Sequence, residues 1–163
     1  MVILSKQDIL RLVERGRLGV EPFDSNLVKE NGIDLRMGKE IARFTGDPQQ
    51  PYRKEQSSTF TLRPHETILF ATLEYIRLPE DLMAFIQLRS TFARLGCTIP
   101  PTVVDAGFEG CLTVQFRNGP LPLTLQSGTP VLHLILATLS RPTVPYKRPY
   151  AGKRGIVLPT YPP

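Results

Sequence analysis

The chain has 163 residues and a mass of 18.3 kDa, which is the size of one domain rather than two. Hydrophobic residues make up 41% of it and charged residues 21%, so a buried core is expected and extended disorder is excluded. The 16 prolines favour turns and short strands over a helical bundle. No apolar run approaches the ~20 residues of a membrane helix, and we expect a cytoplasmic protein.

The charges are unevenly distributed along the chain. The net charge is +5, yet all 15 acidic residues lie at or before Glu109, and every charged residue after it is basic. A segment without carboxylates attracts anions, and composition alone favours a phosphate ligand and a nucleic acid equally. The two cysteines, Cys97 and Cys111, are too few for a disulfide framework or a closed zinc site, so we expect both in the core.

One helix is predicted near the start, at Ser5–Arg15. Ser5 can cap it, Asp8 follows three residues later as in a capping box, and apolar residues occupy one face before Gly16.

Short strands dominate the rest. Alternating or apolar runs predict strands at Ile33–Met37, Glu40–Phe44, Thr67–Ile76, Leu82–Leu88, Gly110–Phe116, Leu121–Leu125 and Val131–Leu139. The segment Asp47–Thr59 reads as a polar loop, and the proline-rich tail from Arg141 as irregular. The pattern predicts a mainly β domain, a barrel or jelly roll, with one N-terminal helix.

Several common catalytic motifs are absent. The sequence contains no P-loop, no glycine-rich dinucleotide fingerprint, no nucleophile elbow and no zinc deaminase signature. His133 lies inside an apolar run and is expected to be a wall residue rather than a ligand. Catalysis must therefore come from carboxylates, basic side chains and bound water.

Three segments carry the functional signal: NGIDLR at residues 31–36, RSTFARLG at 89–96 and VDAGFEG at 104–110 together with the preceding Val103. The first places a carboxylate and a guanidinium two residues apart on a strand. In the second, a short helix starts at Ser90 and Thr91, whose hydroxyls lie between two arginines and suit a phosphate. The third reads as a turn-rich hairpin with an acid beside an aromatic ring. Each alone is also typical of an ordinary cap or turn.

In this order and spacing, the segments resemble the superfamily of dUTPases and dCTP deaminases. The helix and NGIDLR are more similar to the dCTP deaminase branch, which includes archaeal-type dUTPases. The resemblance implies one dUTPase-like domain over residues 1–163, a distorted β-barrel or jelly roll. It further implies a homotrimer with active sites between subunits, whose basic, proline-rich tail (141–163) closes over the site.

The resemblance also implies residue roles. Ser90 and Arg94, with Arg89 adjacent, would hold phosphates, and Asp34 would support the site. Asp105 would contact the 3′-hydroxyl and orient the attacking water, and Phe108 would stack beneath the deoxyribose. Backbone groups around Val104 would read the base. The tail would close over the triphosphate with three residues, Tyr150, Lys153 and Arg154.

Gln115 decides between the two activities at this point. In the deaminases a glutamate stands ten residues after the motif aspartate, and an amide has no useful basicity to replace it. Cleavage between the α and β phosphates needs less: an aspartate-activated water, cations, and Mg²⁺ bound mainly through the triphosphate, with no metal-ligating side chains predicted. We therefore expect a dUTP diphosphatase that converts dUTP to dUMP and pyrophosphate.

Two alternatives stay open. The first is zinc-independent deamination of dCTP to dUTP, or a bifunctional conversion of dCTP to dUMP. The second, less favoured, is a non-catalytic barrel that binds nucleotides or nucleic acid, because the tail combines tyrosines with basic residues. The simultaneous presence of Asp105, Phe108 and both arginines argues against the second alternative. The expected partners are deoxyuridine triphosphate, or dCTP, and further copies of the chain, with no membrane.

Overall fold

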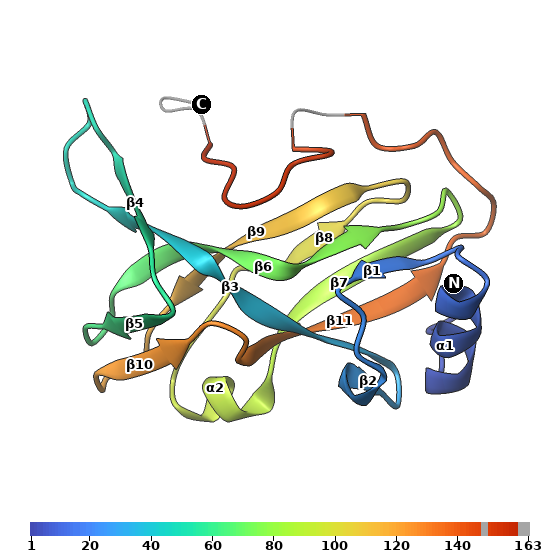
Figure 1. Ribbon diagram of the computed structural model, residues 1–163, viewed down its shortest axis with the longest axis horizontal. Helices are drawn as coiled ribbons and strands as arrows, with labels where there is room; N and C mark the ends of the chain where they lie inside the picture. The colour runs from blue at the N-terminus through green and yellow to red at the C-terminus, as the bar shows by residue number, and fades with distance from the viewer. Residues whose placement is uncertain (148–149, 160–163) are drawn as a thin grey trace.

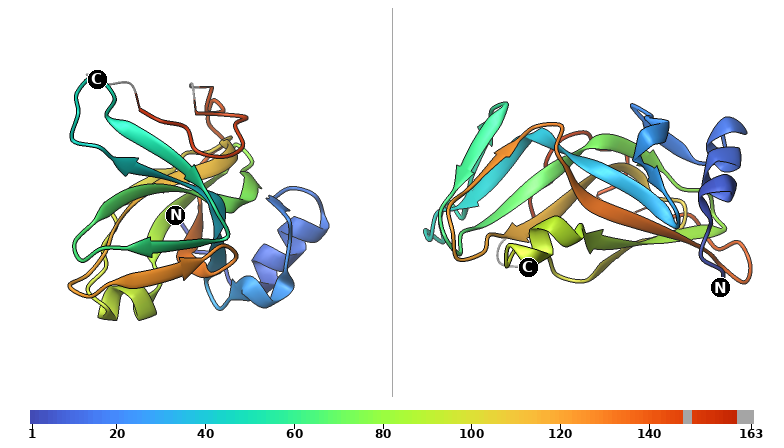
Figure 2. Two further views of the ribbon diagram at one scale, coloured as in Figure 1. Left: turned by 60° about the vertical axis from the view of Figure 1, so that its left-hand side comes forward. Right: turned by 90° about the horizontal axis from the view of Figure 1, so that it is seen from below.

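A curled antiparallel sheet forms the body of the molecule, in a computed structural model that describes residues 1–147 and 150–159 (Figures 1 and 2). In chain order its elements are α1 (Lys6–Glu14), β1 (Gly19–Glu21), η1 (Ser25–Leu27), β2 (Val28–Lys29), β3 (Gly32–Phe44), β4 (Tyr52–Gln56), β5 (Thr59–Leu62), β6 (Thr67–Arg77), β7 (Leu82–Leu88), α2 (Ser90–Arg94), β8 (Thr102–Val104), β9 (Glu109–Arg117), β10 (Leu123–Gln126) and β11 (Pro130–Thr138).

The main sheet has nine strands in the order β1-β6-β3-β11-β7-β8, with β2 and β4 also pairing with β3 and β9 pairing with β6. A separate two-stranded sheet, β10-β5, lies at one end of the molecule, and α1 lies at the other (Figure 1). The apolar side chains inside the curl make one large core that includes Ile9 of α1 and Phe116 of β9. The mainly β architecture with its N-terminal helix is therefore confirmed.

The N-terminal helix forms as its sequence predicts. The Ser5 hydroxyl accepts a hydrogen bond from the Asp8 backbone N–H at 3.3 Å and donates to the Asp8 carboxylate at 2.6 Å. These two bonds satisfy the start of α1, which ends at Glu14, one residue before the expected limit. Within the described residues, no helix has the length and apolar character needed to cross a membrane.

One long strand replaces the two that were expected on either side of Gly38. β3 runs without a break from Gly32 to Phe44, although its register against β6 shifts between Met37 and Ile41. A Cβ on Gly38 would lie 2.8 Å from the Ala71 carbonyl oxygen of β6. The glycine therefore permits a close approach of two backbones instead of ending a strand.

The expected polar loop at Asp47–Thr59 is wrong in its second half. Tyr52–Gln56 forms β4, which pairs with β3 so that Arg43 lies opposite Arg53 and Ala42 opposite Lys54. The strand has an exposed, charged face, so it lacks the apolar alternation that marks a half-buried strand. Its stabilising contacts include an ion pair at 2.9 Å between Arg43 and Glu55, which only the fold brings together.

The expected hairpin at Val103–Gly110 is also wrong. β8 pairs with β7 and β9 pairs with β6, so the turn that joins them connects two separate parts of the sheet. The connection between β6 and β7 holds this turn in place. Leu78 N–H donates to the Phe108 carbonyl at 2.9 Å, and Gly107 N–H donates to the Pro79 carbonyl at 3.1 Å.

Candidate functional site

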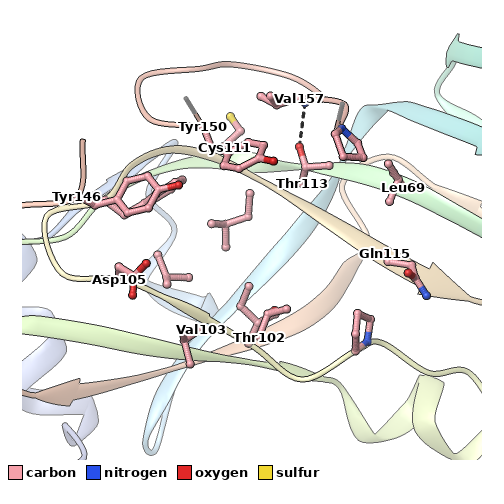
Figure 3. A pocket seen from close by; sticks show the side chains of 16 residues that line it. Leu69, Thr102, Val103, Asp105, Cys111, Thr113, Gln115, Tyr146, Tyr150 and Val157 are labelled. Atoms are coloured by element: carbon pink, nitrogen blue, oxygen red, sulfur yellow. Dashed lines mark hydrogen bonds between the residues drawn. The ribbon is translucent and has the colours of Figure 1, made fainter. Parts of the chain in front are cut away.

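A pocket of ≈ 450 Å³ lies between β8, β9 and the C-terminal segment (Figure 3). Its walls are mostly apolar, and its polar side chains include Asp105, Thr113 and Gln115. The volume suits a small organic ligand, and the few polar groups would fix its orientation. Among the described residues that line the pocket, Asp105 carries the single formal charge. We refer to this cavity as the Asp105 pocket.

Asp105 and Gln115 lie at opposite ends of the Asp105 pocket (Figure 3). Gln115 extends from β9 on the same face as Cys111 and Thr113, because every second residue of a strand shares a face. Cys111 is buried in the wall, and burial raises the pKa of its thiol. Both cysteines are buried, as expected.

The C-terminal segment forms one wall of the pocket through Tyr146, Tyr150, Val157 and Pro159. It is bound to β9 by backbone hydrogen bonds from Gly152 N–H to the Glu109 carbonyl at 2.7 Å and from Cys111 N–H to the Lys153 carbonyl at 2.9 Å. Further along, Val157 N–H donates to the Thr113 hydroxyl at 3.0 Å (Figure 3). The segment is therefore anchored along the strand that carries Gln115.

The turn that carries Asp105 is packed against the same segment. Tyr146 N–H donates to the Ala106 carbonyl at 3.1 Å, and the Tyr146 ring packs against Phe108 with 5.7 Å between ring centroids. Gly107 has a φ of 74°, and a Cβ there would lie 2.6 Å from Pro145. Phe108 is buried while the Asp105 side chain is exposed, so the turn presents a carboxylate beside an aromatic wall.

A second pocket, of ≈ 340 Å³, contains Asp34, Arg89, Ser90 and His133. The Asp34 carboxylate is almost fully buried and lies 3.1 Å from Arg89 Nε and 2.9 Å from His133 Nδ1. The Arg89 guanidinium also donates to the Pro130 carbonyl at 3.3 Å. We refer to this cavity as the Asp34 pocket. It combines the basic side chains of Arg89 and His133 with a hydroxyl and the carboxylate that contacts them, and Lys29 and Glu30 also line it.

The two pockets share no lining residue and lie on opposite faces of β7, where Ile86 lines the Asp105 pocket and the next residue, Gln87, lines the Asp34 pocket. Val104, which precedes Asp105, pairs with Ala84, whereas Ser90 follows the end of the strand at Leu88. At about 3.3 Å per residue, the four steps from Ala84 to Leu88 alone span about 13 Å. In Figure 1 α2, which begins at Ser90, lies below the sheet and the C-terminal segment above it. One copy of the chain therefore does not bring the expected phosphate and nucleoside groups together.

The expected site residues are accordingly divided. The Asp105 pocket contains Val104, Asp105, Phe108, Gln115 and Tyr150, and the Asp34 pocket contains Asp34, Arg89 and Ser90. The remaining four, Thr91, Arg94, Lys153 and Arg154, are exposed and line neither pocket. Their phosphate contacts stay predictions.

Arg154 and Glu109 make contacts outside the pockets. Arg154 lies over the Tyr75 ring, 4.4 Å from its centroid, and 3.7 Å from Glu21. Glu109 lies 3.6 Å from Arg77 and does not line the Asp105 pocket. The closest acidic neighbour of Asp105 in sequence is therefore not part of that cavity.

Sequence reasoning assigned no site role to several lining residues of the two pockets, including Thr113, Tyr146 and His133. Thr113 alternates with Gln115 on β9, which was a usable signal, whereas Tyr146 lies in a segment without regular structure and gave none. His133, expected to be a wall residue, lines the Asp34 pocket, and the sequence did not show that it bonds to Asp34. Its apolar neighbours on β11 concealed this role.

The described residues offer no ready-made metal site, since no three His, Cys, Asp or Glu side chains are grouped to hold an ion. An ion that binds chiefly through phosphate oxygens and waters does not need such a group, and Mg²⁺ often binds in this way. The residues present therefore fit a Mg²⁺ that arrives with a triphosphate.

The fold and the two pockets define a mainly β protein with cavities of the size of a small organic ligand, and the comparisons give its family. Residues 3–139 match the family model for dCTP deaminase-like proteins, and the chain belongs to this family. It is 44% identical, over 98% of this chain and 93% of the relative, to a protein from Sulfurisphaera tokodaii named dCTP deaminase. It is 42% identical, over 96% of this chain and 98% of the relative, to one from Sulfolobus islandicus rod-shaped virus 1 named probable deoxyuridine 5′-triphosphate nucleotidohydrolase.

The fold has a solved counterpart in the 2′-deoxycytidine 5′-triphosphate deaminase of Agrobacterium tumefaciens. The two structures superpose with a TM-score of 0.71 at 18% identity, over 82% of this chain. The chain spans 46% of the length of that protein chain. At this identity, the likeness concerns the fold alone.

These comparisons contradict the expected dUTP diphosphatase activity. Besides the Sulfurisphaera protein, three further archaeal relatives that are 42% identical over 97–98% of this chain are named dCTP deaminase. The expectation depended on one side chain, because Gln115 cannot serve as the base that the deaminases carry at its position. Similarity over the whole chain outweighs that substitution, and the deaminase alternative is the better supported.

Proposed function

We propose that this protein deaminates dCTP, converting dCTP and water to dUTP and ammonia. The observation that carries the proposal is the 44% identity, over nearly the whole chain, to a relative named dCTP deaminase. The Asp105 pocket supports it, because a mostly apolar cavity with few polar groups suits a nucleoside.

The proposal assigns the proton transfer to Asp105. Deamination at C4 of cytosine needs a group that takes a proton from the attacking water and returns one to the ring or the departing amine. Asp105 is the carboxylate among the described residues that line the pocket, and it is exposed to solvent there. Gln115, at the far end, offers hydrogen bonds but no proton acceptor for this step.

The triphosphate requires positive charge that the Asp105 pocket does not supply. The described residues that line the pocket include no arginine or lysine, whereas the Asp34 pocket contains Arg89 and Ser90. The separation of the two pockets supports a homotrimer in which the Asp34 pocket of one copy faces the Asp105 pocket of another. Mg²⁺ carried on the triphosphate would neutralise part of its charge.

The C-terminal tail is proposed to close this composite site. Its residues 150–159 already line and anchor the Asp105 pocket, while 148–149 and 160–163 lie outside the described residues. Tyr150 at the pocket wall supports the closing role better than Lys153 and Arg154 do.

The test offers the purified protein dCTP or dUTP separately, each with Mg²⁺, and measures ammonia and pyrophosphate. We expect ammonia from dCTP in amounts equal to the dUTP formed. Absence of ammonia with intact, folded protein overturns the proposal, and pyrophosphate from either nucleotide would reveal a hydrolytic step that the proposal does not include.

A further inference from the structure

A row of polar side chains crosses the sheet at the Asp34 pocket. Asp34 of β3 lies directly opposite His133 of β11, and His133 lies directly opposite Gln87 of β7. Directly opposed residues on neighbouring antiparallel strands share a face, so the three side chains are arranged side by side. All three line the pocket, where they meet Arg89 and Ser90.

The His133 ring is held at both nitrogens. Nδ1 lies 2.9 Å from the Asp34 carboxylate, and Nε2 lies 3.4 Å from the Asn31 side-chain oxygen. Gly32 provides the space, because a Cβ at that position would lie only 2.6 Å from Nε2. A neutral imidazole carries one N–H and the imidazolium carries two, so the charged form keeps its bond from Nδ1 to Asp34 and gains an N–H at Nε2 that can exchange the long contact with Asn31 for a phosphate oxygen.

The charge of His133 decides the net charge of the pocket. Its other charged lining residues are Lys29, Glu30, Asp34 and Arg89, and the two positive and two negative formal charges sum to zero. A neutral imidazole therefore leaves the pocket without net charge, and a protonated one makes it positive. Histidine is the side chain that gains or loses its charge most readily between pH 5 and 8.

We infer that His133 is a phosphate-binding residue, and that the Asp34 pocket holds a polyphosphate more tightly when its imidazole is protonated. Asp34 acts as a positioning residue, since its carboxylate contacts both His133 and Arg89. The inference rests on the proposed function, which requires a triphosphate in this pocket. It goes further by adding a cation to the site and by making substrate affinity depend on pH.

Binding of inorganic tripolyphosphate, measured by calorimetry with Mg²⁺ at about pH 6 and about pH 8, tests this role. The ligand also gains protons near pH 6, so the informative quantity is the difference between variants at each pH. We expect the wild type to lose about ten-fold more affinity than His133→Gln between the two pH values. His65→Gln, which removes the other histidine of the chain, should match the wild type. Equal pH dependence of wild type and His133→Gln overturns the inference.

A measurement on the wild type covers the case in which His133→Gln does not fold. The ring signals of the two histidines can be followed by NMR against pH, with His65→Gln providing the assignment. Adding tripolyphosphate should move the titration midpoint of His133 to higher pH and leave that of His65 unchanged; unmoved signals from both overturn the inference.

Nucleotide kinetics separate this inference from the proposed function. With dCTP, His133→Gln should raise KM at about pH 6 several-fold while leaving kcat within about two-fold. A tripolyphosphate effect without any ammonia from dCTP would overturn the deaminase proposal and leave the phosphate role of His133 intact. Ammonia release with the same KM in the wild type and in His133→Gln would overturn the phosphate role of His133 and leave the deaminase proposal intact.

Discussion

The Glu40 carboxylate of β3 accepts a hydrogen bond from the Ile156 backbone N–H at 2.9 Å, joining the first quarter of the chain to its tail. Lys54 reinforces this contact, since its Nζ donates to the Ile156 carbonyl at 3.0 Å. Gly155 lies so close that a Cβ there would be 2.5 Å from the same carboxylate. Two basic residues that trypsin recognises, Lys153 and Arg154, directly precede this anchor.

Glu40→Ala should therefore free the tail. A hydrogen bond to a charged group contributes about 1.5–3 kcal/mol, so local opening should become at least about ten-fold more frequent. Limited trypsin digestion, with mass spectrometry of the fragments, should show faster cleavage after Lys153 and Arg154. Glu14→Ala, an exposed change on α1, serves as the control. Equal cleavage rates would show that Glu40 does not hold the tail.

Asp105→Asn should abolish most deamination and leave the fold intact. Loss of a proton-transferring group lowers kcat by about 10²–10⁴-fold. The side chain is exposed, so the melting temperature should change little. Glu109→Gln is the matched control, because Glu109 faces Arg77 outside the pocket and should keep its activity. An Asp105→Asn variant as active as the wild type would remove Asp105 from the mechanism.

Gln115→Glu should accelerate ammonia release from dCTP. It places a second carboxylate in the pocket, at the end away from Asp105, where a proton-transfer group contributes about 10²-fold or more. We expect kcat to rise at least about ten-fold. Gln115→Leu, which removes the polarity, should not accelerate the reaction. A slower Gln115→Glu enzyme would show that the amide itself is needed.

Glu74 stabilises the fold rather than the site. Its buried carboxylate accepts from the Arg36 backbone N–H at 2.8 Å and from Arg36 Nε at 2.6 Å. Glu74→Ala leaves the Arg36 guanidinium without its partner, which should lower the free energy of unfolding by about 3–5 kcal/mol. The exposed pair of Arg77 and Glu21, 3.4 Å apart, provides the comparison, and Glu21→Gln should cost less than about 1 kcal/mol. Urea denaturation of both variants measures the difference.

The free energy of unfolding should fall in acid because Arg43 pairs with two carboxylates, those of Glu55 and Glu66. Burial raises the pKa of Glu66, but hydrogen bonds from the Arg63 backbone N–H and the Arg43 guanidinium outweigh it, so the pKa lies below its usual value. The pKa of Glu55 is lowered in the same way, since Arg43 and then Arg53 outweigh burial.

A carboxylate whose folded pKa is lowered contributes stability above its unfolded pKa of about 4.3 and loses that contribution as the pH falls through the folded value. The urea midpoint should therefore decline below about pH 4, and Arg43→Gln should flatten that decline. The exposed change Lys39→Gln should leave the profile unaltered. Parallel profiles for all three proteins would exclude Arg43 as the cause.

Local patterns predicted the elements that bury a regular set of side chains. β7 has the expected bounds, and β11 differs from its expected range by one residue at each end. β4 escaped prediction because its stabilising partners, including Arg43, are distant in the sequence. Gly38 suggested a break because a sequence does not show that Ala71 approaches it.

The sequence identified residues that line the two pockets, but it did not show how these residues are arranged in space. Ser90 and Asp105 were both identified, yet the register of β7 against β8 places them in different pockets. The expected reaction was wrong for another reason, because it depended on a single residue, Gln115, and not on the similarity of the whole chain. A motif defines which groups are present, and only the register shows which of them can meet.

Because the tail is anchored on β9, the effect of an insertion in the tail depends on where it is made. Glu109, Cys111 and Thr113 each contact the tail, so the contacts recur at alternate residues of the strand. An insertion just after β11 could be absorbed by the irregular stretch that follows. An insertion between Gly152 and Val157 would instead shift the later contacts out of step with β9, and the wall that Val157 contributes would be lost.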